Sequence, residues 1–173
     1  MIYKNLDHFL NLIAEPNRSS CLQIFNDNKE RFQIAPGSLT KHQAWPGGYV
    51  HHVEETMNIA YNMFEMMNTF RPLNFTLSDA ILILFLHDLE KPFRYVEPKQ
   101  EMNTEKEKKD FVQNFIDTYN IVLTENHKNA LQYIHGEGED YSRTENVQKP
   151  LAAFVHLCDT VSARIWPDYP KRV

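Results

Sequence analysis

Apolar residues recur along most of the chain at the three- and four-residue spacing that places them on one face of a helix. The clearest pattern covers residues 49–67, at successive spacings of four, three, four, three and four residues. Residues 80–86 are apolar on every side and follow Thr76 and Asp79, a capping-box pair. We therefore expect a long helix with one buried face, then a central helix that begins after Thr76 and ends before Pro92.

Weaker patterns of the same period predict five further helices. They cover residues 2–13, 22–32, 111–119, 130–134 and 150–165. No run of alternating apolar residues is long enough for a strand, and no repeat or domain-splitting linker is present. The sequence therefore predicts an all-α fold in which residues 1–173 form one domain of about seven helices. The charged stretch 97–110 is expected to be a solvated connector and helix start, with a mobile lid as the alternative.

Composition narrows the class of protein. Hydrophobic residues make up 42% of the chain and charged residues 24%, which is typical of soluble globular domains. The longest apolar run is far shorter than the ~20 residues of a membrane span, and no signal peptide is visible, so we expect a cytoplasmic protein without membrane contact. Cys21 and Cys158 form no CxxC pair and are expected to be reduced. The net charge of −5 argues against binding of long duplex nucleic acid.

His87-Asp88 is the most unusual local feature, because it ends the fully apolar helix. A carboxylate beside large apolar residues is expected to be buried, and a buried carboxylate needs a partner or a metal ion. The alternative is that His87 only complements the dipole at the end of its helix.

Two other polar residues occupy core-facing positions. In the long helix His52 lies beside the buried stripe, whereas the adjacent His51 points away from it. Asp159 lies among the small and apolar residues of the last helix, where a carboxylate also needs a cation or a donor. For each residue taken alone, a structural role such as a core hydrogen bond or a salt bridge is the alternative.

Taken together, the order His52, His87-Asp88, Asp159 resembles the HD superfamily of metal-dependent phosphohydrolases. The stretch from Ile83 to Lys91 is similar to that family's apolar HDxGK segment, with Glu90 in place of the usual glycine. Further segments between residues 35 and 163 resemble the HD domain of a group of bacterial 3′–5′ exoribonucleases. These are Ala35-Pro36-Gly37-Ser38, His42, Pro46-Gly47-Gly48, Ile134-His135-Gly136-Glu137 and Asp159-Thr160-Val161-Ser162-Ala163.

The resemblance implies an HD-type helical fold and a divalent metal held by His52, His87, Asp88 and Asp159. Two imidazoles and two carboxylates suit Mn, Fe, Co, Ni, Zn or Mg. Asp88 would orient the attacking water or take its proton, and Lys91 would hold a phosphate oxygen or the leaving group. The alternative for Lys91 is a solvated lysine in the last turn of its helix. Family members with two or more metals carry additional histidines that this chain lacks, so we expect one firmly bound ion.

The remaining candidates concern the substrate. His42 is expected to contact phosphate as a protonated imidazole, and Trp45 offers a surface on which a base can stack. His135 and Glu137 are candidate substrate or supplementary metal contacts. No chemical role is expected for three other histidines: His127 is expected at the surface, and His51 and His156 are expected to be structural.

The sequence thus predicts a phosphohydrolase acting on small nucleotides or short oligonucleotides, with phosphodiester cleavage favoured over a nucleotidase (phosphomonoesterase) activity. Two alternatives belong to other classes. One is a non-catalytic nucleotide-binding module that retains the fold. The other is an HD-type iron oxygenase, which needs more histidine and carboxylate ligands than this chain offers.

Overall fold

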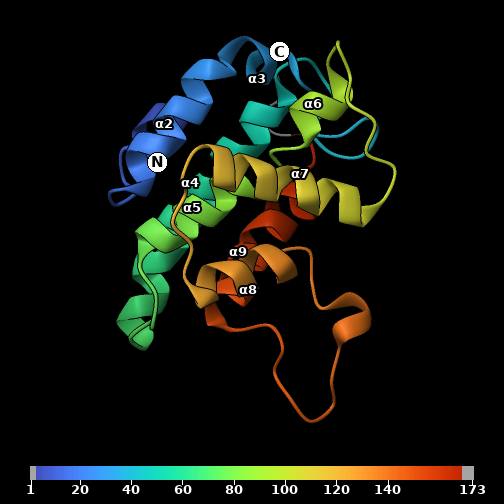
Figure 1. Ribbon diagram of the computed structural model, residues 1–173. Helices are drawn as coiled ribbons and strands as arrows, with labels where there is room; N and C mark the ends of the chain where they lie inside the picture. The colour runs from blue at the N-terminus through green and yellow to red at the C-terminus, as the bar shows by residue number, and fades with distance from the viewer. Residues whose placement is uncertain (1–2, 169–173) are drawn as a thin grey trace.

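The predicted all-α class is confirmed by the computed structural model, which describes residues 3–168 and contains no strand in that range (Figure 1). Ile2, assigned above to the first helix, lies outside the described residues. The elements are α1 (Leu6–Leu10), α2 (Asn17–Asp27), α3 (Lys29–Ile34), α4 (Gly48–Phe70), α5 (Leu77–Leu86), α6 (Lys91–Tyr95), α7 (Glu105–Thr118), α8 (Glu125–Tyr133), the 3-10 turn η1 (Gly138–Asp140), α9 (Pro150–Thr160) and the π-helical turn η2 (Val161–Ile165).

Helix α5 forms the centre of the core, as its apolar sequence predicts. Its residues 80–86 are at most 2% exposed, and it contacts α1, α2, α4, α8 and α9. The predicted capping box is present at its start: the Thr76 hydroxyl accepts from the Asp79 N–H, and the Asp79 carboxylate accepts from the Thr76 N–H at 2.7 Å. A helix surrounded in this way holds its last residues, and those that follow, inside the protein.

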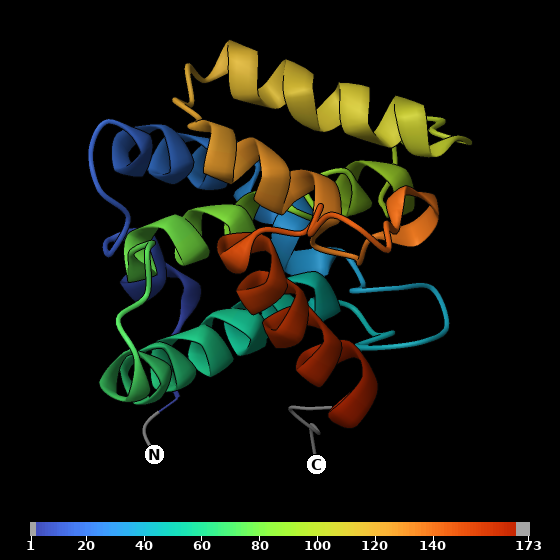
Figure 2. The same cartoon turned by 90° about the horizontal axis from the view of Figure 1, so that it is seen from below.

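Helices α4 and α9 cross beside α5, and α8 packs against α9 on the other side (Figure 2). The predicted stripe of α4 is confirmed, since Tyr49, Val53, Thr56 and Ala60 are fully buried. Its later members, near the end of the helix, are partly buried against the same core. The three helices α4, α5 and α9 therefore converge, and this convergence positions the site.

Three predicted boundaries were wrong. The helix expected at residues 22–32 is divided at Asn28 into α2 and α3. The helix expected at residues 2–13 is shorter, since α1 covers only Leu6–Leu10. The predicted end of the central helix before Pro92 is confirmed, because α5 ends at Leu86 and Pro92 lies in the first turn of the separate helix α6. The last predicted helix keeps its α geometry only to Thr160 and then widens into the π turn η2.

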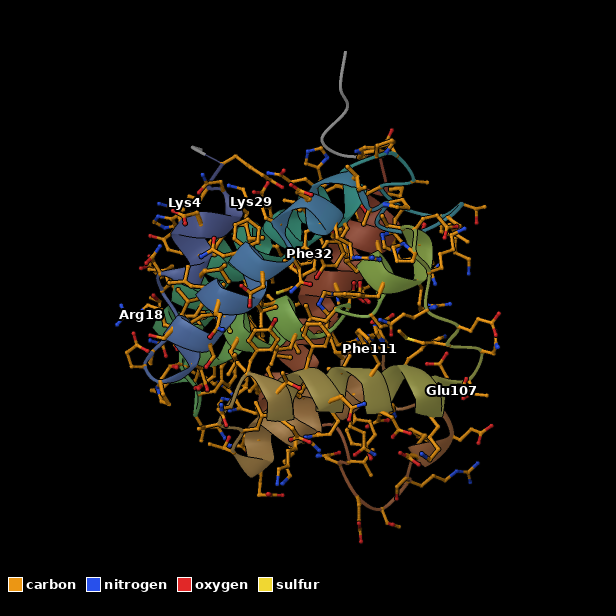
Figure 3. The ribbon with its side chains drawn as sticks, turned by 45° about the horizontal axis from the view of Figure 1, so that its top comes forward. Lys4, Arg18, Lys29, Phe32, Glu107 and Phe111 are labelled. Carbon is orange, nitrogen blue, oxygen red and sulfur yellow. The ribbon has the colours of Figure 1, made fainter. Side chains whose placement is uncertain are left out.

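Helix α7 lies at the outside of the bundle, next to α6 (Figures 1 and 2). Its anchor is aromatic: the rings of Phe111 and Phe115 lie 5.0 and 5.1 Å from the ring of Phe93 in α6. Figure 3 shows Phe111 on this helix and Glu107 near its start. The charged stretch 97–110 is therefore a loop followed by the first residues of α7, as expected for a connector. Among the described residues, no helix is long and apolar enough to cross a membrane.

The loop that leads into α4 folds closely against the start of that helix. The Gly48 N–H donates to the Trp45 carbonyl at 2.8 Å, and the Tyr49 N–H donates to the Ala35 carbonyl at 3.0 Å. A Cβ atom on Gly48 would lie 1.8 Å from the carbonyl oxygen of Gln43. Only glycine fits between these two stretches of backbone.

We expect Gly48→Ala to lower the free energy of unfolding by about 3 kcal/mol or more, because the clash is with backbone that cannot rotate away. Gly138→Ala is the control. No atom lies within 4 Å of its added Cβ, and only its φ of +55° is unfavourable, so we expect a loss of about 1 kcal/mol. Urea unfolding followed by circular dichroism measures both. Equal losses would show that the loop relaxes around an added methyl group.

Candidate functional site

Four charged or ionisable side chains meet where α4, α5 and α9 converge. His52 projects from α4, His87 and Asp88 follow the last turn of α5, and Asp159 lies near the end of α9. Nε2 of His52 is 3.1 Å from Oδ1 of Asp159 and 3.5 Å from Oδ2 of Asp88. Nε2 of His87 is 3.1 Å from the same Asp88 oxygen. The structure thus brings together all four residues that the sequence analysis selected as ligands.

The ligand atoms form two overlapping groups. His52, His87 and Asp159 offer one atom each within 4.8 Å of one another, and so do His87, Asp88 and His135. His87 belongs to both groups. Within the described residues no other group of three or more such side chains has this geometry, so these are the residues that could hold a divalent cation.

The imidazole of His87 is oriented by the backbone of its own helix. Its Nδ1 lies 2.8 Å from the carbonyl oxygen of Leu84, which can only accept a hydrogen bond. Nδ1 therefore carries a proton, and in the neutral ring Nε2 presents a lone pair. This Nε2 is buried and has no hydrogen-bond partner.

His52 is oriented by a hydrogen-bond relay that sequence reasoning missed. Nδ1 of His52 lies 3.0 Å from the Ser162 hydroxyl, and that hydroxyl donates to Oε2 of Glu55 at 2.5 Å. The Gln43 amide donates to the same Glu55 oxygen at 2.9 Å. Because the Ser162 proton is used on Glu55, Nδ1 of His52 donates to Ser162, and its buried Nε2 is left with a lone pair.

The two lone pairs face carboxylate oxygens, an arrangement that is repulsive without a positive charge between them. A proton or a metal ion can supply that charge. Burial lowers the pKa of His87, but the carboxylates of Asp88 and Asp159 outweigh it and raise the value to about 8. Burial raises the pKa of Asp159, but its contact with His52 at 3.1 Å and the charge of His87 bring it down to about 2. These groups form an anionic site with two imidazole nitrogens, the donor set of a divalent metal.

Lys91 lies next to this cluster and pairs with Asp88, with Nζ 2.5 Å from Oδ2. Burial alone would raise the pKa of Asp88, but His87 and Lys91 hold it well below its usual range. Asp88 is therefore ionised at neutral pH. The pKa of the neighbouring Glu90 is shifted in the opposite direction, because burial and the charge of Asp88 raise it to about 7.

A cleft of about 480 Å³ opens above Asp88 and Asp159 and is lined by both basic and acidic side chains. The basic residues that line it are Lys41, Lys91, Arg94, Lys108 and Arg164. Three of these basic residues pair with carboxylates of the same cleft: Lys91 with Asp88, Arg94 with Glu90 and Lys108 with Glu105. The chain as a whole carries a net charge of −5, so this concentration of cations is local. A cleft with cations above a carboxylate and imidazole floor suits a phosphate-bearing ligand, whose oxygens the basic groups can bind.

The remaining candidates divide into those in the cleft and those outside it. His42 and His135 line the cleft, and the side chain of His135 is 60% exposed. The expected charge on His42 is wrong, because burial and then the nearby His52 and Lys91 lower its pKa to about 4. His42 is therefore a neutral imidazole near pH 7. Its Nδ1 donates to Oε1 of Gln43 at 2.9 Å, so its Nε2 presents a lone pair and offers a phosphate no charge.

Trp45 and Glu137 are not brought to the cluster. The Trp45 indole donates to Nδ1 of His51 at 2.9 Å and is not among the residues that line the cleft. Oε1 of Glu137 accepts from the Gln148 N–H at 3.4 Å. Neither residue belongs to a group of ligand atoms, because the tight loops that carry them direct their side chains to local partners.

Two histidines differ from the expectations. His127 was expected at the surface but is 6% exposed, with Nε2 2.8 Å from Oδ1 of Asp79. That pair joins the starts of α5 and α8. His156 was expected to be structural and does bond to the Ile134 carbonyl through Nδ1, at 2.6 Å. It also lines the cleft, so it belongs to the site as well.

Some of the missed residues left a signal in the sequence. Glu55 follows His52 by three positions, so both lie on one face of α4. Ser162 follows Asp159 by the same interval. Gln43 left none, because a buried amide in an irregular loop is recognisable only once its partners are known. The same holds for the cleft cations, which come from α6, α7, η2 and the loop before α4.

Comparisons of this chain with protein-family models, with curated proteins and with solved structures found no match in any of the three. The chemistry of the site therefore has to be inferred from its own residues.

We expect His52→Ala to lose bound metal and His51→Ala to keep it. His52 is fully buried in the cluster, whereas its neighbour contacts the Trp45 indole. Elemental analysis after dialysis against manganese, with circular dichroism as the check of folding, measures the difference. Full occupancy in His52→Ala would place the metal elsewhere.

The relay makes a separate prediction. Ser162→Ala removes the group that fixes the ring of His52, and we expect metal affinity to fall by about 10- to 100-fold with the helical signal retained. Ser142→Ala, in the loop between η1 and α9, serves as the control and should bind metal as the unmodified protein does, because Ser142 belongs to neither group of ligand atoms. Equal affinities for the two variants, measured by competition with a chelating dye, would show that the relay does not position His52.

Proposed function

We propose that this protein is a metal-dependent phosphohydrolase of the HD type that cleaves phosphoester bonds of small nucleotides or short oligonucleotides. One observation carries the proposal: two buried imidazole nitrogens without hydrogen-bond partners face two carboxylates beneath a cleft of five basic residues. The donor set suits a divalent metal, and the cleft suits phosphate. The order of the four ligand residues, which resembles the HD superfamily, agrees with both.

The residues fit a single divalent ion held by His52, His87, Asp88 and Asp159, with Mn, Fe, Co, Ni, Zn and Mg all compatible with the donors. Such an ion lowers the pKa of water and offsets the negative charge that develops on the phosphoryl group. The chain supports this chemistry by holding both imidazoles in the tautomer that presents Nε2, through the Leu84 carbonyl and Ser162.

The other roles follow from charge and position. Lys91 holds Asp88 ionised, so that the carboxylate can accept a proton from an attacking water. The basic side chains around the cleft bind phosphate oxygens, and their position at its walls places the phosphorus above the carboxylates. His135 and His156 offer further hydrogen bonds to the substrate from the α8–α9 side.

We favour phosphodiesters over monoesters, because the cleft is open and lined by cations along several elements. The two buried, unpaired thiols of Cys21 and Cys158 agree with a reducing compartment such as the cytoplasm. The competing classes are a nucleotide-binding module without catalysis and an iron oxygenase, and each predicts a different result in the activity assay.

We expect the manganese-loaded protein to cleave a dinucleotide at least about tenfold faster than it releases phosphate from a nucleoside monophosphate. The reason is that the basic residues along the open cleft can hold the linking phosphate with a nucleoside on either side of it. Asp88→Asn should lose most of this activity, because an amide cannot take a proton from water. Chromatography of the products measures both rates.

The exposed Asp7→Asn is the matched control and should keep full activity. Phosphate release from the monophosphate alone, with the dinucleotide intact, would make the protein a nucleotidase. Nucleotide binding without turnover under any of the metals would identify a binding module. Iron retention with oxygen consumption would identify an oxygenase.

A further inference from the structure

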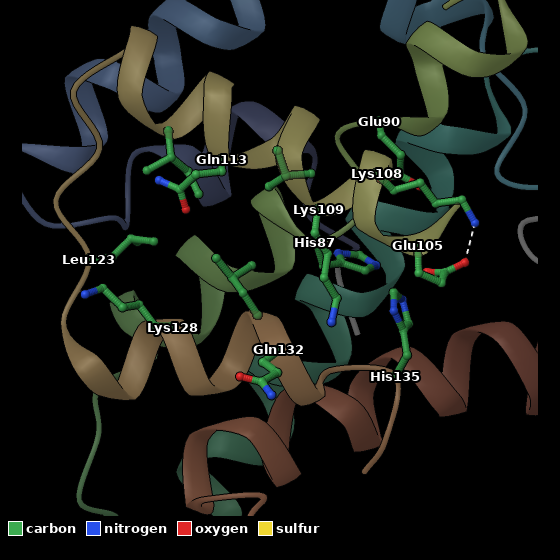
Figure 4. Close-up of a pocket in the computed structure, with 13 residues that line it drawn as sticks. His87, Glu90, Glu105, Lys108, Lys109, Gln113, Leu123, Lys128, Gln132 and His135 are labelled. Carbon is green, nitrogen blue, oxygen red and sulfur yellow. Dashed lines mark hydrogen bonds and ion pairs between the residues drawn. The ribbon is translucent and has the colours of Figure 1, made fainter. Parts of the chain in front are cut away.

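A second recess continues from the metal cluster between α7 and α8 and has a different character from the cleft (Figure 4). It encloses about 350 Å³ and begins at His87 and His135. Its floor is apolar, from Val112 and Ile116 of α7 and from Leu123 and Leu131 on the opposite side. We call this recess the α7–α8 groove.

The α7–α8 groove and the cationic cleft form one continuous surface. Glu90, Glu105, Lys108 and His135 line both of them. Figure 4 shows Lys108 and Glu105 joined by an ion pair at the junction, with His135 facing them from the α8 side. A ligand with its phosphate in the cleft would therefore have its next portion directed into the groove.

The rim of the groove is polar, in contrast to its apolar floor. Gln113 and Gln132 stand on opposite helices, as Figure 4 shows. Each uses its amide N–H₂ within its own segment: Gln113 donates to Asp117 at 2.8 Å, and Gln132 donates to the Tyr133 hydroxyl at 3.0 Å. Their carbonyl oxygens are the acceptors that this rim offers. A flat group with apolar faces and hydrogen-bonding edges matches an apolar floor with amide groups at its rim.

Helix α7 can form one wall of such a groove because its apolar residues are divided between two surfaces. Phe111 and Phe115 anchor the helix to Phe93 of α6. Val112 and Ile116, one position further along in each case, line the groove. The ring contacts of the anchor do not involve Val112, which is only partly buried and can contact a ligand, whereas Ile116 is 5% exposed and forms the buried base of the groove.

We infer that the α7–α8 groove binds the base of the substrate, so that one nucleoside unit lies between α7 and α8 while its phosphate lies in the cationic cleft. The inference rests on the proposed function and adds the part of the substrate that the metal cluster cannot recognise. A volume of about 350 Å³ is at the lower end of the range for small-molecule sites and suits a single base with part of its ribose. Longer substrates would extend from the phosphate toward the open cleft.

The test compares ligands that differ only in the base. Isothermal titration calorimetry in EDTA, which prevents turnover, measures binding of the four nucleoside 5′-monophosphates and of ribose 5-phosphate. We expect the best-bound nucleotide to bind at least about tenfold more tightly than ribose 5-phosphate. Equal affinities, or no measurable binding of any nucleotide in the millimolar range, overturn the inference.

A variant locates the base. Val112→Trp fills the groove, and we expect it to reduce nucleotide affinity to that of ribose 5-phosphate while leaving the latter unchanged. Val122→Trp is the matched control, because Val122 is 57% exposed and does not line the groove. Nucleotide affinity that survives in Val112→Trp overturns the inference.

Hydrogen exchange provides a third test, and it uses the unmodified protein, so its result does not depend on whether a variant folds. We expect slower exchange in α7 and α8 with the nucleotide than with ribose 5-phosphate, and equal exchange contradicts the inference. These readouts are separate from catalysis. Base-dependent binding without hydrolysis by the metal-loaded protein would support the groove and refute the proposed function. Hydrolysis without base-dependent binding would do the reverse.

Discussion

The negative charge that Asp88 and Asp159 place against two buried imidazoles is the constraint around which this end of the core is built. Nε2 of His52 and Nε2 of His87 each face a carboxylate oxygen at 3.1 Å, and neither has a hydrogen-bond partner. In an interior of low dielectric constant, such a group is stable only if a positive charge lies within it. Lys91 supplies part of that charge beside Asp88. The arrangement leaves room for a cation that the helices themselves do not provide.

The buried carboxylates and imidazoles are held in place by packed helices. The ligand-bearing residues come from α4, α5 and α9, which contact one another, and α5 is buried on all sides. The hydrogen bonds behind the ligands extend the order outward: Ser162 and Glu55 fix one imidazole, and the loop before α4 supplies Gln43 to the same relay. The close approach of that loop to Gly48 therefore serves the site as well as the fold. A displacement of this loop would move Gln43 and so change the hydrogen bonds that orient the His52 imidazole.

The periphery contributes the features that distinguish one ligand from another. Helix α7 is attached through its aromatic residues to α6, and it adds Lys108 to the cleft and Val112 and Ile116 to the groove. The basic residues around the cleft come from several elements of an acidic chain and gather at its walls, where the proposed function places a phosphate. In the proposed function, the core would therefore supply the metal ligands, and the outer elements would supply the contacts that select the substrate.

Local patterns in the sequence determined the helical class, the buried face of α4, the capped and fully apolar α5, and the choice of His52 over His51, since each depends only on helical periodicity and neighbours in the chain. The resemblance of His87-Asp88 and its companions to a known order of ligands selected the four residues that the structure brings together. Only the tertiary structure decided which of the other polar residues join them. It placed Trp45 against His51, buried His127 against Asp79, and assembled the relay and the cationic cleft from distant segments. Such contacts depend on how the helices pack against one another, and packing joins positions that no local periodicity connects.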